Sequence, residues 1–141
     1  MVAIAAALMW GIAAVLPSLR VDVPRAGLIA AIFAALGILI AGAGLVAFHR
    51  ARTTANPMRP EAATSLVTTG IYRWTRNPMY LGWLPVLAGW AVYLQHAGAL
   101  LMVPLFMLYL TRFQIIPEER ALAAKFGGQF DAYRQRVRRW L

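Results

Sequence analysis

Two short polar motifs hold the side chains of this 141-residue chain that are best suited to chemistry. The first is Arg76–Asn77–Pro78, at the end of a polar loop, and the second is Pro117–Glu118–Glu119, just after a long apolar stretch. A carboxylate can hold a cationic ligand group such as an ammonium, and an arginine or a helix N-terminus can hold an anion. We therefore expect the two motifs to form one ligand site.

Both motifs also have a purely structural interpretation. Asn77 suits the cap of a helix that has Pro78 in its first turn. Glu118 and Glu119 suit the first turn of another helix, where the dipole favours carboxylates. Neighbouring helical residues point about 100° apart, so the two acids are expected to differ in role. Capping and ligand binding are compatible, and the residues alone leave both interpretations open.

Other kinds of site find little support. The chain has no cysteine, which excludes disulfides, thiol nucleophiles and thiolate metal ligands. His49 and His96 fall at opposite ends of predicted membrane helices, about 30 Å apart, so they cannot share a haem iron. We expect no metal site and interfacial positions for both histidines. Arg112 lies near the end of an apolar segment and either snorkels to the interface or has a function.

The composition indicates an integral membrane protein. The chain is 61% hydrophobic and 13% charged, whereas soluble domains average about 45–50% apolar and about 25% charged residues. The net charge is +9, which in a soluble protein would suggest a nucleic acid partner. Here the basic residues flank apolar segments, so they indicate membrane topology and contact with anionic lipids, and we expect no nucleic acid partner.

Four apolar segments are candidates for membrane-spanning helices. They are Val2–Leu19, Gly27–Phe48, Met79–Gln95 and Ala99–Ile116. A kink is expected near Pro17 in the first, and Pro85 and Pro104 within the third and fourth require a packed bundle. Small residues that permit close helix packing recur in the second segment: Gly37, Ala41 and Gly44.

Two polar segments accompany these helices. In His49–Thr69, Pro57 and Pro60 argue against a continuous helix. Pro117–Leu141 is amphipathic, with an interruption expected at Gly127–Gly128. Its apolar residues recur every three or four positions, which predicts one helix face: Leu122, Phe126, Phe130, Tyr133 and Val137. A basic and aromatic cluster at the end suits a membrane surface: Arg134, Arg136, Arg138, Arg139 and Trp140.

The positive charges predict the topology. With four spans, the N-terminus, the polar loop and the C-terminal tail share one side, and that side holds every lysine and arginine except Arg20 and Arg25. Positive residues stay cytoplasmic. The sequence therefore predicts an all-α membrane protein with four transmembrane helices and a cytoplasmic C-terminal amphipathic helix. We treat 1–141 as one domain, with two N-terminal spans in 1–48 and a catalytic core with two more in 49–141.

The motif-bearing half of the chain resembles a known family. The run TGIYRWTRNPMYLG over 69–82 and the pattern IxPEExxLxxxFGxxFxxYxxxVxRW over Ile115–Trp140 resemble the bacterial branch of the isoprenylcysteine carboxyl methyltransferase and phospholipid methyltransferase superfamily. The first two spans match only in hydrophobicity. The resemblance implies a methyltransferase of the bacterial inner membrane, with both termini cytoplasmic. It would use S-adenosyl-L-methionine at the cytoplasmic face, among membrane lipids, on a lipophilic acceptor that enters from the bilayer.

The resemblance also implies site residues. One of the paired acids is expected to hold the amino group of the cofactor. Relatives often carry histidine where Asn77 stands, so we expect hydrogen bonding there and no acid–base role. Glu119 is a candidate base for an amine acceptor, and Arg76 a cation for a carboxylate acceptor; with Asn77 they are the expected catalytic residues. The implied cofactor contacts are Val67, Gly70, Tyr72, Asn77, Pro78, Tyr80, Leu81, Gly82, Glu118, Glu119, Tyr133 and Arg136.

Two other classes of protein remain as alternatives. One is a small membrane transporter or a quinone- or lipid-binding subunit without methyltransferase activity, and the other is a structural membrane subunit. A transporter would more often show an internal repeat or charge at mid-span, and the sequence has neither. The identity of the acceptor and the oligomeric state are left open by the sequence.

Overall fold

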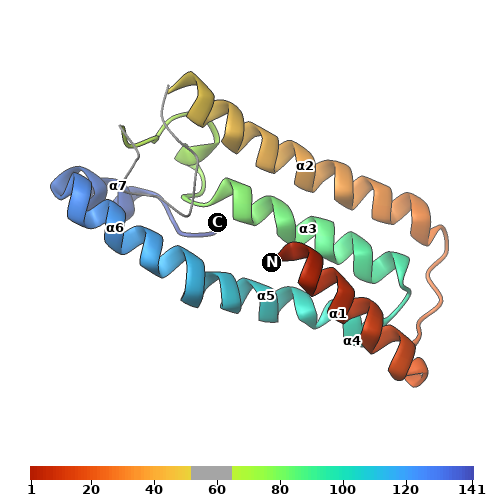
Figure 1. Cartoon of the computed structure of the whole chain (residues 1–141). Coiled ribbons are helices and arrows are strands. Elements are labelled where there is room, and N and C mark those ends of the chain that lie inside the picture. The colour runs from red at the N-terminus through yellow and green to blue at the C-terminus, as the bar shows by residue number, and fades with distance from the viewer. Residues whose placement is uncertain (52–64) are drawn as a thin grey trace. The chain divides into compact units, whose positions relative to one another are not determined.

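The computed structural model describes residues 1–51 and 65–141, and within these ranges the chain is all-helical, without β-strands (Figure 1). The expected all-α class is therefore confirmed. The helices are α1 (Val2–Val15), α2 (Ala26–Arg50), α3 (Pro78–Tyr93), α4 (Ala97–Leu100), α5 (Met102–Leu110), α6 (Ile116–Phe126) and α7 (Gly128–Arg136). Pro57 and Pro60, on which the prediction of a non-helical loop depended, lie outside the described residues, as do Arg52 and Arg59.

The chain forms two compact units. Unit 1 comprises Met1–Leu39 and Gly82–Leu108, and unit 2 comprises Ile40–Leu81 and Tyr109–Leu141. Each unit thus combines a segment from either half of the chain.

Two helical segments are long and apolar enough to cross a membrane. They are α2, with a mean hydropathy of 2.6, and the continuous run Ala97–Phe126, with 1.8. Only 11% and 22% of their most apolar stretches are buried. The core helix of a soluble protein would be mostly buried, so side chains such as Leu28, Ile32 and Leu105, which are exposed, indicate contact with lipid.

The first predicted span is shorter than expected. α1 ends at Val15 and is followed by a 3₁₀ turn at Pro17–Leu19, so the helix stops at the proline and does not continue through a kink to Leu19. Proline removes a backbone donor and disfavours helical geometry at the residue before it, and Leu16 has φ −117° and ψ 62°. Fourteen residues make a helix of about 21 Å, against a bilayer core of about 30 Å.

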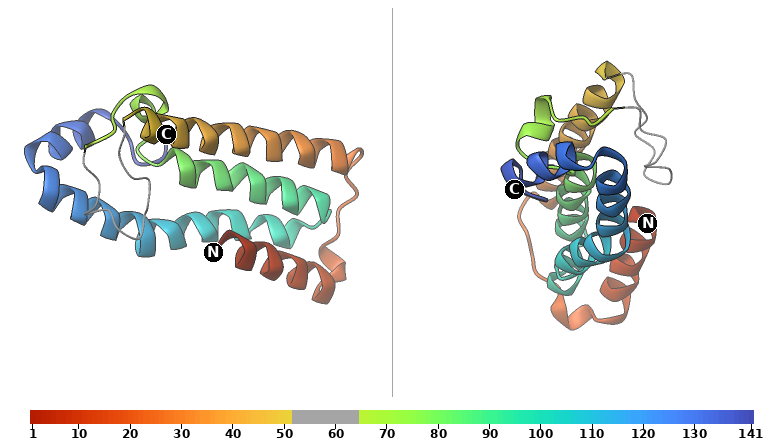
Figure 2. Two further views of the ribbon diagram at one scale, coloured as in Figure 1. Left: turned by 45° about the horizontal axis from the view of Figure 1, so that its top comes forward. Right: turned by 90° about the vertical axis from the view of Figure 1, so that its left-hand side faces the viewer.

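Glycines allow α2 and α3 to pack closely in unit 1, as the left view of Figure 2 illustrates. A Cβ at Gly37 would collide with the carbonyl oxygen of Gly82 and the side chain of Val86. A Cβ at Gly89 would lie 2.9 Å from the carbonyl oxygen of Ala30. The expected close packing at Gly37 is confirmed. In unit 2, Gly44 likewise packs against Pro78 and Met79.

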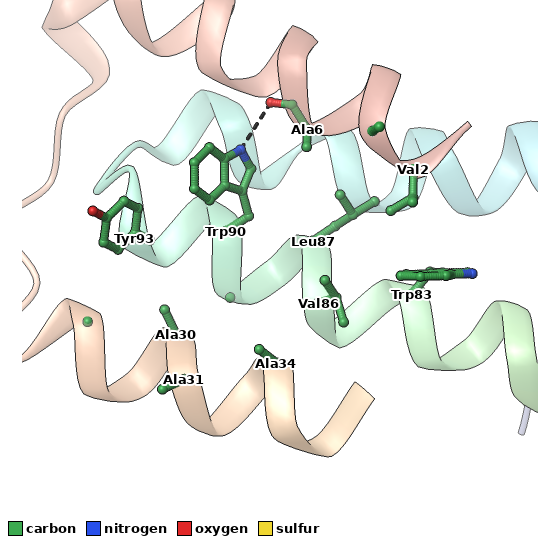
Figure 3. Close-up of a pocket in the computed structure, with 13 residues that line it drawn as sticks. Val2, Ala6, Ala30, Ala31, Ala34, Trp83, Val86, Leu87, Trp90 and Tyr93 are labelled. Atoms are coloured by element: carbon green, nitrogen blue, oxygen red, sulfur yellow. Dashed lines mark hydrogen bonds between the residues drawn. The ribbon is translucent and has the colours of Figure 1, made fainter. Parts of the chain in front are cut away.

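Unit 1 also contains an apolar pocket of about 490 Å³ (Figure 3). Its walls come from α1, α2 and α3 and consist mainly of alanine, glycine and aromatic residues. The indole N–H of Trp90 donates to the carbonyl of Ala6 at 3.0 Å, which ties α3 to α1, and the ring of Trp90 stacks on Tyr93. The pocket therefore has a structured wall in which the indole N–H of Trp90 is already bonded.

His96 is buried in the turn between α3 and α4, and its interfacial position stays a prediction. It is 3% exposed and caps α4, because its Nδ1 accepts a hydrogen bond from the N–H of Ala99 at 3.1 Å. Its Nε2 lies 2.8 Å from the carbonyl oxygen of Leu16. With Nδ1 as acceptor, Nε2 carries the proton and donates. Both nitrogens thus serve the backbone of unit 1.

In unit 2 the C-terminal segment folds as a helical hairpin. α6 and α7 meet at Gly127, whose φ of +49° favours glycine, so the predicted interruption is confirmed. The predicted apolar face is confirmed, and it is buried within the unit. Phe130, Tyr133 and Val137 form its core, and Leu66, Leu122, Ala123 and Phe126 pack against them.

Candidate active site

A π-helical turn at Thr111–Ile115 places the paired acids. Pro117 lacks an N–H, and its ring would clash with the carbonyl of Phe113 in a regular α-helix. The wider π turn accommodates the proline, and the helical run continues from α5 into α6. Glu118 and Glu119 therefore follow a helix and do not sit at a free helix N-terminus, so the helix dipole is not sufficient to explain them.

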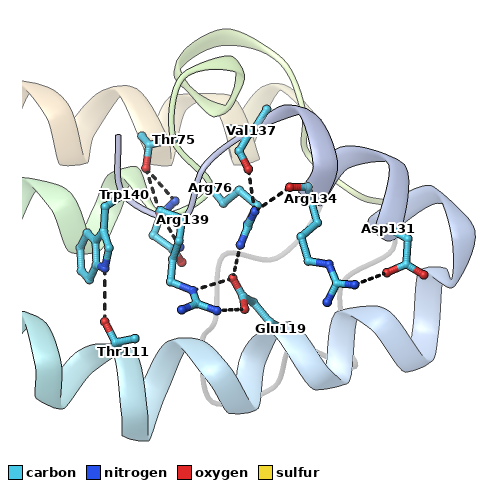
Figure 4. Close-up of polar contacts among 10 residues, drawn as sticks. Thr75, Arg76, Thr111, Glu119, Asp131, Arg134, Val137, Arg139 and Trp140 are labelled. Atoms are coloured by element: carbon cyan, nitrogen blue, oxygen red, sulfur yellow. Dashed lines mark hydrogen bonds and ion pairs between the residues drawn. The ribbon is translucent and has the colours of Figure 1, made fainter.

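Glu119 is held by two arginines in unit 2 (Figure 4). Its Oε1 lies 2.7 Å from Nη2 of Arg76, and its Oε2 lies 2.7 Å from Nη2 of Arg139. Nε of Arg139 donates a third bond to Oε1 at 3.1 Å. Burial alone would raise the pKa of Glu119, but the hydrogen bonds from Arg139 and Arg76 lower it below its ordinary value. Glu119 thus remains a carboxylate with both oxygens occupied.

Arg76 also bonds to the C-terminal tail. The residues that join the loop, the paired acids and this tail are called the clamp below: Thr75, Arg76, Asn77, Glu119 and Arg139. Its Nη1 donates to the carbonyl oxygens of Val137 at 2.6 Å and Arg134 at 3.1 Å, and its backbone N–H donates to Arg138 at 3.0 Å. The side chain is only 9% exposed. Its Nε is buried without a hydrogen-bond partner among the described residues. Such an orphan donor is costly to bury and suits a ligand acceptor.

Asn77 starts α3 and also holds the tail. Its carbonyl accepts the N–H of Leu81 at 2.8 Å, the first bond of the helix, so its predicted place at the cap is confirmed. Its side-chain amide donates to the carbonyl oxygen of Arg139 at 2.9 Å. The hydroxyl of Thr75 donates to the same oxygen at 3.2 Å and accepts the N–H of Asn77. The loop and the tail are therefore joined at several points.

Glu118 differs from its neighbour. The hydroxyl of Tyr80 donates to its Oε2 at 3.1 Å. The run Ala97–Phe126 is about 45 Å long at 1.5 Å per residue, longer than the bilayer core of about 30 Å. Glu118 lies in the charged end of this run, beyond Ile116, where the predicted fourth span ends. Burial raises the pKa of Glu118 to about 7; the bond from Tyr80 acts against this rise, and the charge of Glu119 adds to it.

Two further tyrosines lie in the neighbourhood of Glu118. The hydroxyl of Tyr133 donates to the carbonyl oxygen of Tyr72 at 2.8 Å, and the ring of Tyr72 meets Phe48 edge-on. Burial, together with the charge of Glu118, raises the pKa of Tyr72 above its ordinary value. Burial does the same for Tyr133. The site therefore has buried aromatic walls around one carboxylate.

The structure brings most of the predicted site residues together in unit 2, but not all of them. Val67 is buried against Ala47 and Tyr72, and Gly70 has φ +62° at the start of the 3₁₀ turn Gly70–Arg73. Gly82 belongs to unit 1, where its carbonyl lies against Gly37. Arg136 is exposed on α7.

Sequence reasoning missed two members of the clamp. The sequence places Arg139 in the basic cluster at the C-terminal end and predicts no role for Thr75. The sequence contains a signal for Arg139, because the longer pattern over Ile115–Trp140 includes it beside Trp140. The indole N–H of Trp140 donates to the hydroxyl of Thr111 at 3.2 Å, so the Arg139–Trp140 pair turns toward the helices of unit 2.

The chain is similar in sequence to known proteins. An uncharacterized protein of Haemophilus influenzae is 44% identical over 63 residues, which are 45% of this chain and all of that protein. No solved structure matches the chain. The sequence pattern of the family described as phospholipid methyltransferase matches residues 26–129, which include both polar motifs. The chain therefore belongs to the phospholipid methyltransferase family, whose members are membrane methyltransferases.

Proposed function

We propose that the protein transfers a methyl group from S-adenosyl-L-methionine to a lipid or other lipophilic acceptor at the cytoplasmic face of the bacterial inner membrane. The observation that carries the proposal is Glu118, a partly buried carboxylate in a family of membrane methyltransferases. Its hydrogen-bond partner among the described residues is the neutral hydroxyl of Tyr80. A buried carboxylate without a cation is costly, and a ligand ammonium would compensate it.

The residues present suit this cofactor. Glu118 would hold its ammonium, because Glu119 is already saturated by Arg76 and Arg139. The orphan Nε of Arg76 would hold its carboxylate, together with the N–H groups of the first turn of α3. The buried rings of Tyr72 and Tyr133 offer faces for the adenine. The bound cofactor would supply an electrophilic methyl group on a sulfonium.

In this proposal Glu119 positions the site and does not act as a base. Its lowered pKa makes it a poor proton acceptor, and its two arginines connect the loop to the tail. Methyl transfer is a single in-line displacement, so the enzyme chiefly has to align two reactants and exclude water. The clamp would serve both needs, because it fixes the tail over the start of α3. Arg76 and Asn77 would contribute by binding and positioning.

The proposed topology has four membrane-spanning helices, with both termini on the cytoplasmic side. Unit 1 contains only Arg20 and Arg25 as cations, and all other lysines and arginines of the chain fall in the ranges of unit 2. By the positive-inside rule this asymmetry favours a cytoplasmic location for the candidate site. The acceptor would enter sideways from the bilayer.

Calorimetry with S-adenosylhomocysteine tests the proposal. The wild-type protein in detergent should bind this product, and Glu118→Gln should weaken binding by a factor of about 10 to 100, as expected for a lost hydrogen bond to a charged group. The control Asp131→Asn also replaces a carboxylate by an amide, at a half-exposed side chain on α7. It should leave binding unchanged. Absence of binding to folded wild-type protein at millimolar ligand would refute the proposal.

A second experiment identifies the acceptor. Membranes that contain the wild-type protein, incubated with S-adenosyl-L-methionine labelled on its methyl group, should yield one labelled lipid fraction. Membranes with Glu118→Gln should yield little of it.

A further inference from the structure

One titratable side chain of unit 1 has no part in the methyl transfer described above. His96 lies in the turn between α3 and α4 and is 3% exposed. Its Nδ1 accepts from the backbone N–H of Ala99 at 3.1 Å, and its Nε2 lies 2.8 Å from the carbonyl oxygen of Leu16. Gly98 packs against the ring, because a Cβ there would lie 3.0 Å from Cε1. Only the neutral ring with its proton on Nε2 can make both bonds.

His96 joins two connections that are far apart in the sequence. Leu16 follows α1, whereas Ala99 lies in α4, which packs against α1. Two bonds of Gln95 lie beside the ring: its carbonyl accepts the N–H of Val21 at 2.9 Å, and its Oε1 accepts the N–H of Val23 at 3.3 Å. The residues that make these bonds are called the joint below: Leu16, Val21, Val23, Gln95, His96 and Ala99.

Proton uptake by His96 is incompatible with these bonds. A protonated imidazole is a donor at both nitrogens, so Nδ1 would confront the N–H of Ala99. That N–H cannot turn away easily, because it also donates to the carbonyl oxygen of His96 at 3.1 Å. The new charge would stand beside a pocket of about 230 Å³ with apolar walls: Val21, Val23, Ala91, Val92, Ala97 and Leu100. A buried charge without a partner is costly.

The surrounding charges do not compensate a proton on His96. The connection from α1 to α2 carries Arg20, Asp22 and Arg25, and the last turn of α3 carries Tyr93. All four are exposed, and α1 and α4 contain no charged side chain. The ion pairs among the described residues do not include His96. The closed joint therefore requires a neutral ring.

We propose that the joint is a pH-sensitive device, which opens when His96 takes up a proton and then exposes the apolar pocket beside it. The closed state binds fewer protons at His96 than the open state, so acid favours opening. Histidine is the side chain that ordinarily changes its charge between pH 5 and 8. In the proposed topology the joint lies on the side of the membrane away from the cytoplasm. The inference does not depend on the proposed methyl transfer.

Hydrogen exchange of backbone amides tests this proposal on the full-length protein in detergent. Exchange is compared at about pH 8 and about pH 5.5, after correction for the intrinsic pH dependence of exchange, because histidine changes its charge in this range. In the wild type, protection of the amides of Val21, Val23 and Ala99 should fall by a factor of about 10 at the lower pH, as expected for one lost hydrogen bond. The amides around Gly37 in α2 should keep their protection.

Two variants assign the response to His96. Asn in place of the histidine can still cap α4 but does not titrate, so His96→Asn should show the same protection of the joint at both pH values. His49→Gln removes the other histidine of the chain, in the last turn of α2, and should respond as the wild type does. A loss of protection in His96→Asn equal to that of the wild type would overturn the inference, as would a wild-type joint that is equally protected at both pH values.

Nuclear magnetic resonance of the wild type provides a test that does not require a folded variant. With ¹⁵N-labelled histidine, the ring of His96 should carry its proton on Nε2 alone at about pH 8, because Nδ1 is an acceptor in the closed joint. On acidification, protonation of Nδ1 and the change in the amide signal of Ala99 should share one midpoint. A ring that is protonated on Nδ1 at pH 8, or an Ala99 signal that does not follow the ring, would overturn the inference.

Discussion

The two units of this protein are built by different interactions. Unit 1 relies on close backbone packing: Gly37 and Gly89 lie against the backbone of neighbouring helices. The indole N–H of Trp90 and Nε2 of His96 also bond to main-chain carbonyls. Unit 2 adds a charged cluster to its apolar core, with Glu119 between Arg76 and Arg139. The first kind of unit is sensitive to added volume, and the second to the loss of a single charged partner. Four predictions follow this contrast, in order of decreasing effect.

The largest effect is expected for Glu119→Ala. This change leaves Arg76, which is 9% exposed, without its acid, and frees Arg139. Breaking a buried ion pair by removing one partner destabilises a protein by about 3 kcal/mol or more. Thermal unfolding in detergent should show this loss, together with weaker binding of S-adenosylhomocysteine because the clamp is open.

Asp131→Ala is the matched control for this variant. Its pair with Arg134 at 3.1 Å is exposed, and exposed ion pairs contribute about 0.2–1 kcal/mol. Equal destabilisation by the two substitutions would contradict the assignment of Glu119 as the acid that holds unit 2 together.

The next largest effect is expected for Gly37→Ala in unit 1. The added methyl group would meet the carbonyl of Gly82, which belongs to the backbone and cannot move aside easily. Overpacking of this kind typically destabilises by about 1–3 kcal/mol, which thermal unfolding measures. Gly11→Ala, on α1, has no atom within 4 Å of the new methyl group and should be neutral or stabilising. If both variants behave alike, close packing at Gly37 does not stabilise unit 1.

A pH dependence should distinguish the two acids of unit 2. The pKa of Glu118 is raised by burial to about 7, and only its carboxylate form can hold the cofactor's ammonium. Affinity for S-adenosylhomocysteine should therefore rise as the pH increases from 6 to 8, by up to about tenfold per pH unit below the pKa. In Glu118→Gln the profile should be flat over this range. A wild-type profile that is equally flat would contradict the role of Glu118.

The same raised pKa has a consequence for stability without ligand. Between the ordinary pKa of 4.5 and the folded value of about 7, the folded state binds more protons at Glu118 than the unfolded state does. The contribution of Glu118 to the free energy of unfolding is therefore fully present below pH 4.5 and is lost as the pH rises through about 7.

The smallest effect is expected for Tyr80→Phe. Loss of the hydroxyl removes the donor to Glu118, at a cost of about 1 kcal/mol, and moves the pH midpoint of cofactor binding upward. In unit 1, Tyr93→Phe keeps the ring that stacks on Trp90 and should change neither stability nor binding. A midpoint that stays in place in Tyr80→Phe would mean that this bond does not tune Glu118.

Much of the fold and part of the site could be predicted from sequence. Hydrophobicity located α2 and the run that ends near Ile116, and the glycines at 127 and 128 marked the break between α6 and α7. The spacing of apolar residues also predicted one face of the C-terminal helices. Periodicity shows which residues share a face but not what covers that face, and here it is covered by Leu66 and by the hairpin itself.

The roles of the two acids show where sequence reasoning ended. Spacing predicted that Glu118 and Glu119 would point in different directions, and this is correct. It could not predict that Arg139, twenty residues later, would pair with Glu119 and leave Glu118 beside Tyr80. An ion pair between distant residues depends on the path of the intervening chain, and that path turns at Gly127.

By itself, the sequence determined the helical class, the apolar helices, the two motifs and the family, because these depend on composition and local spacing. Tertiary structure alone decided which acid is saturated, which arginine has an unpaired buried nitrogen, and which two connections His96 joins. The reason is physical: charge pairing and burial depend on distances of a few ångströms between segments that are far apart in the chain. Local sequence carries no record of those distances.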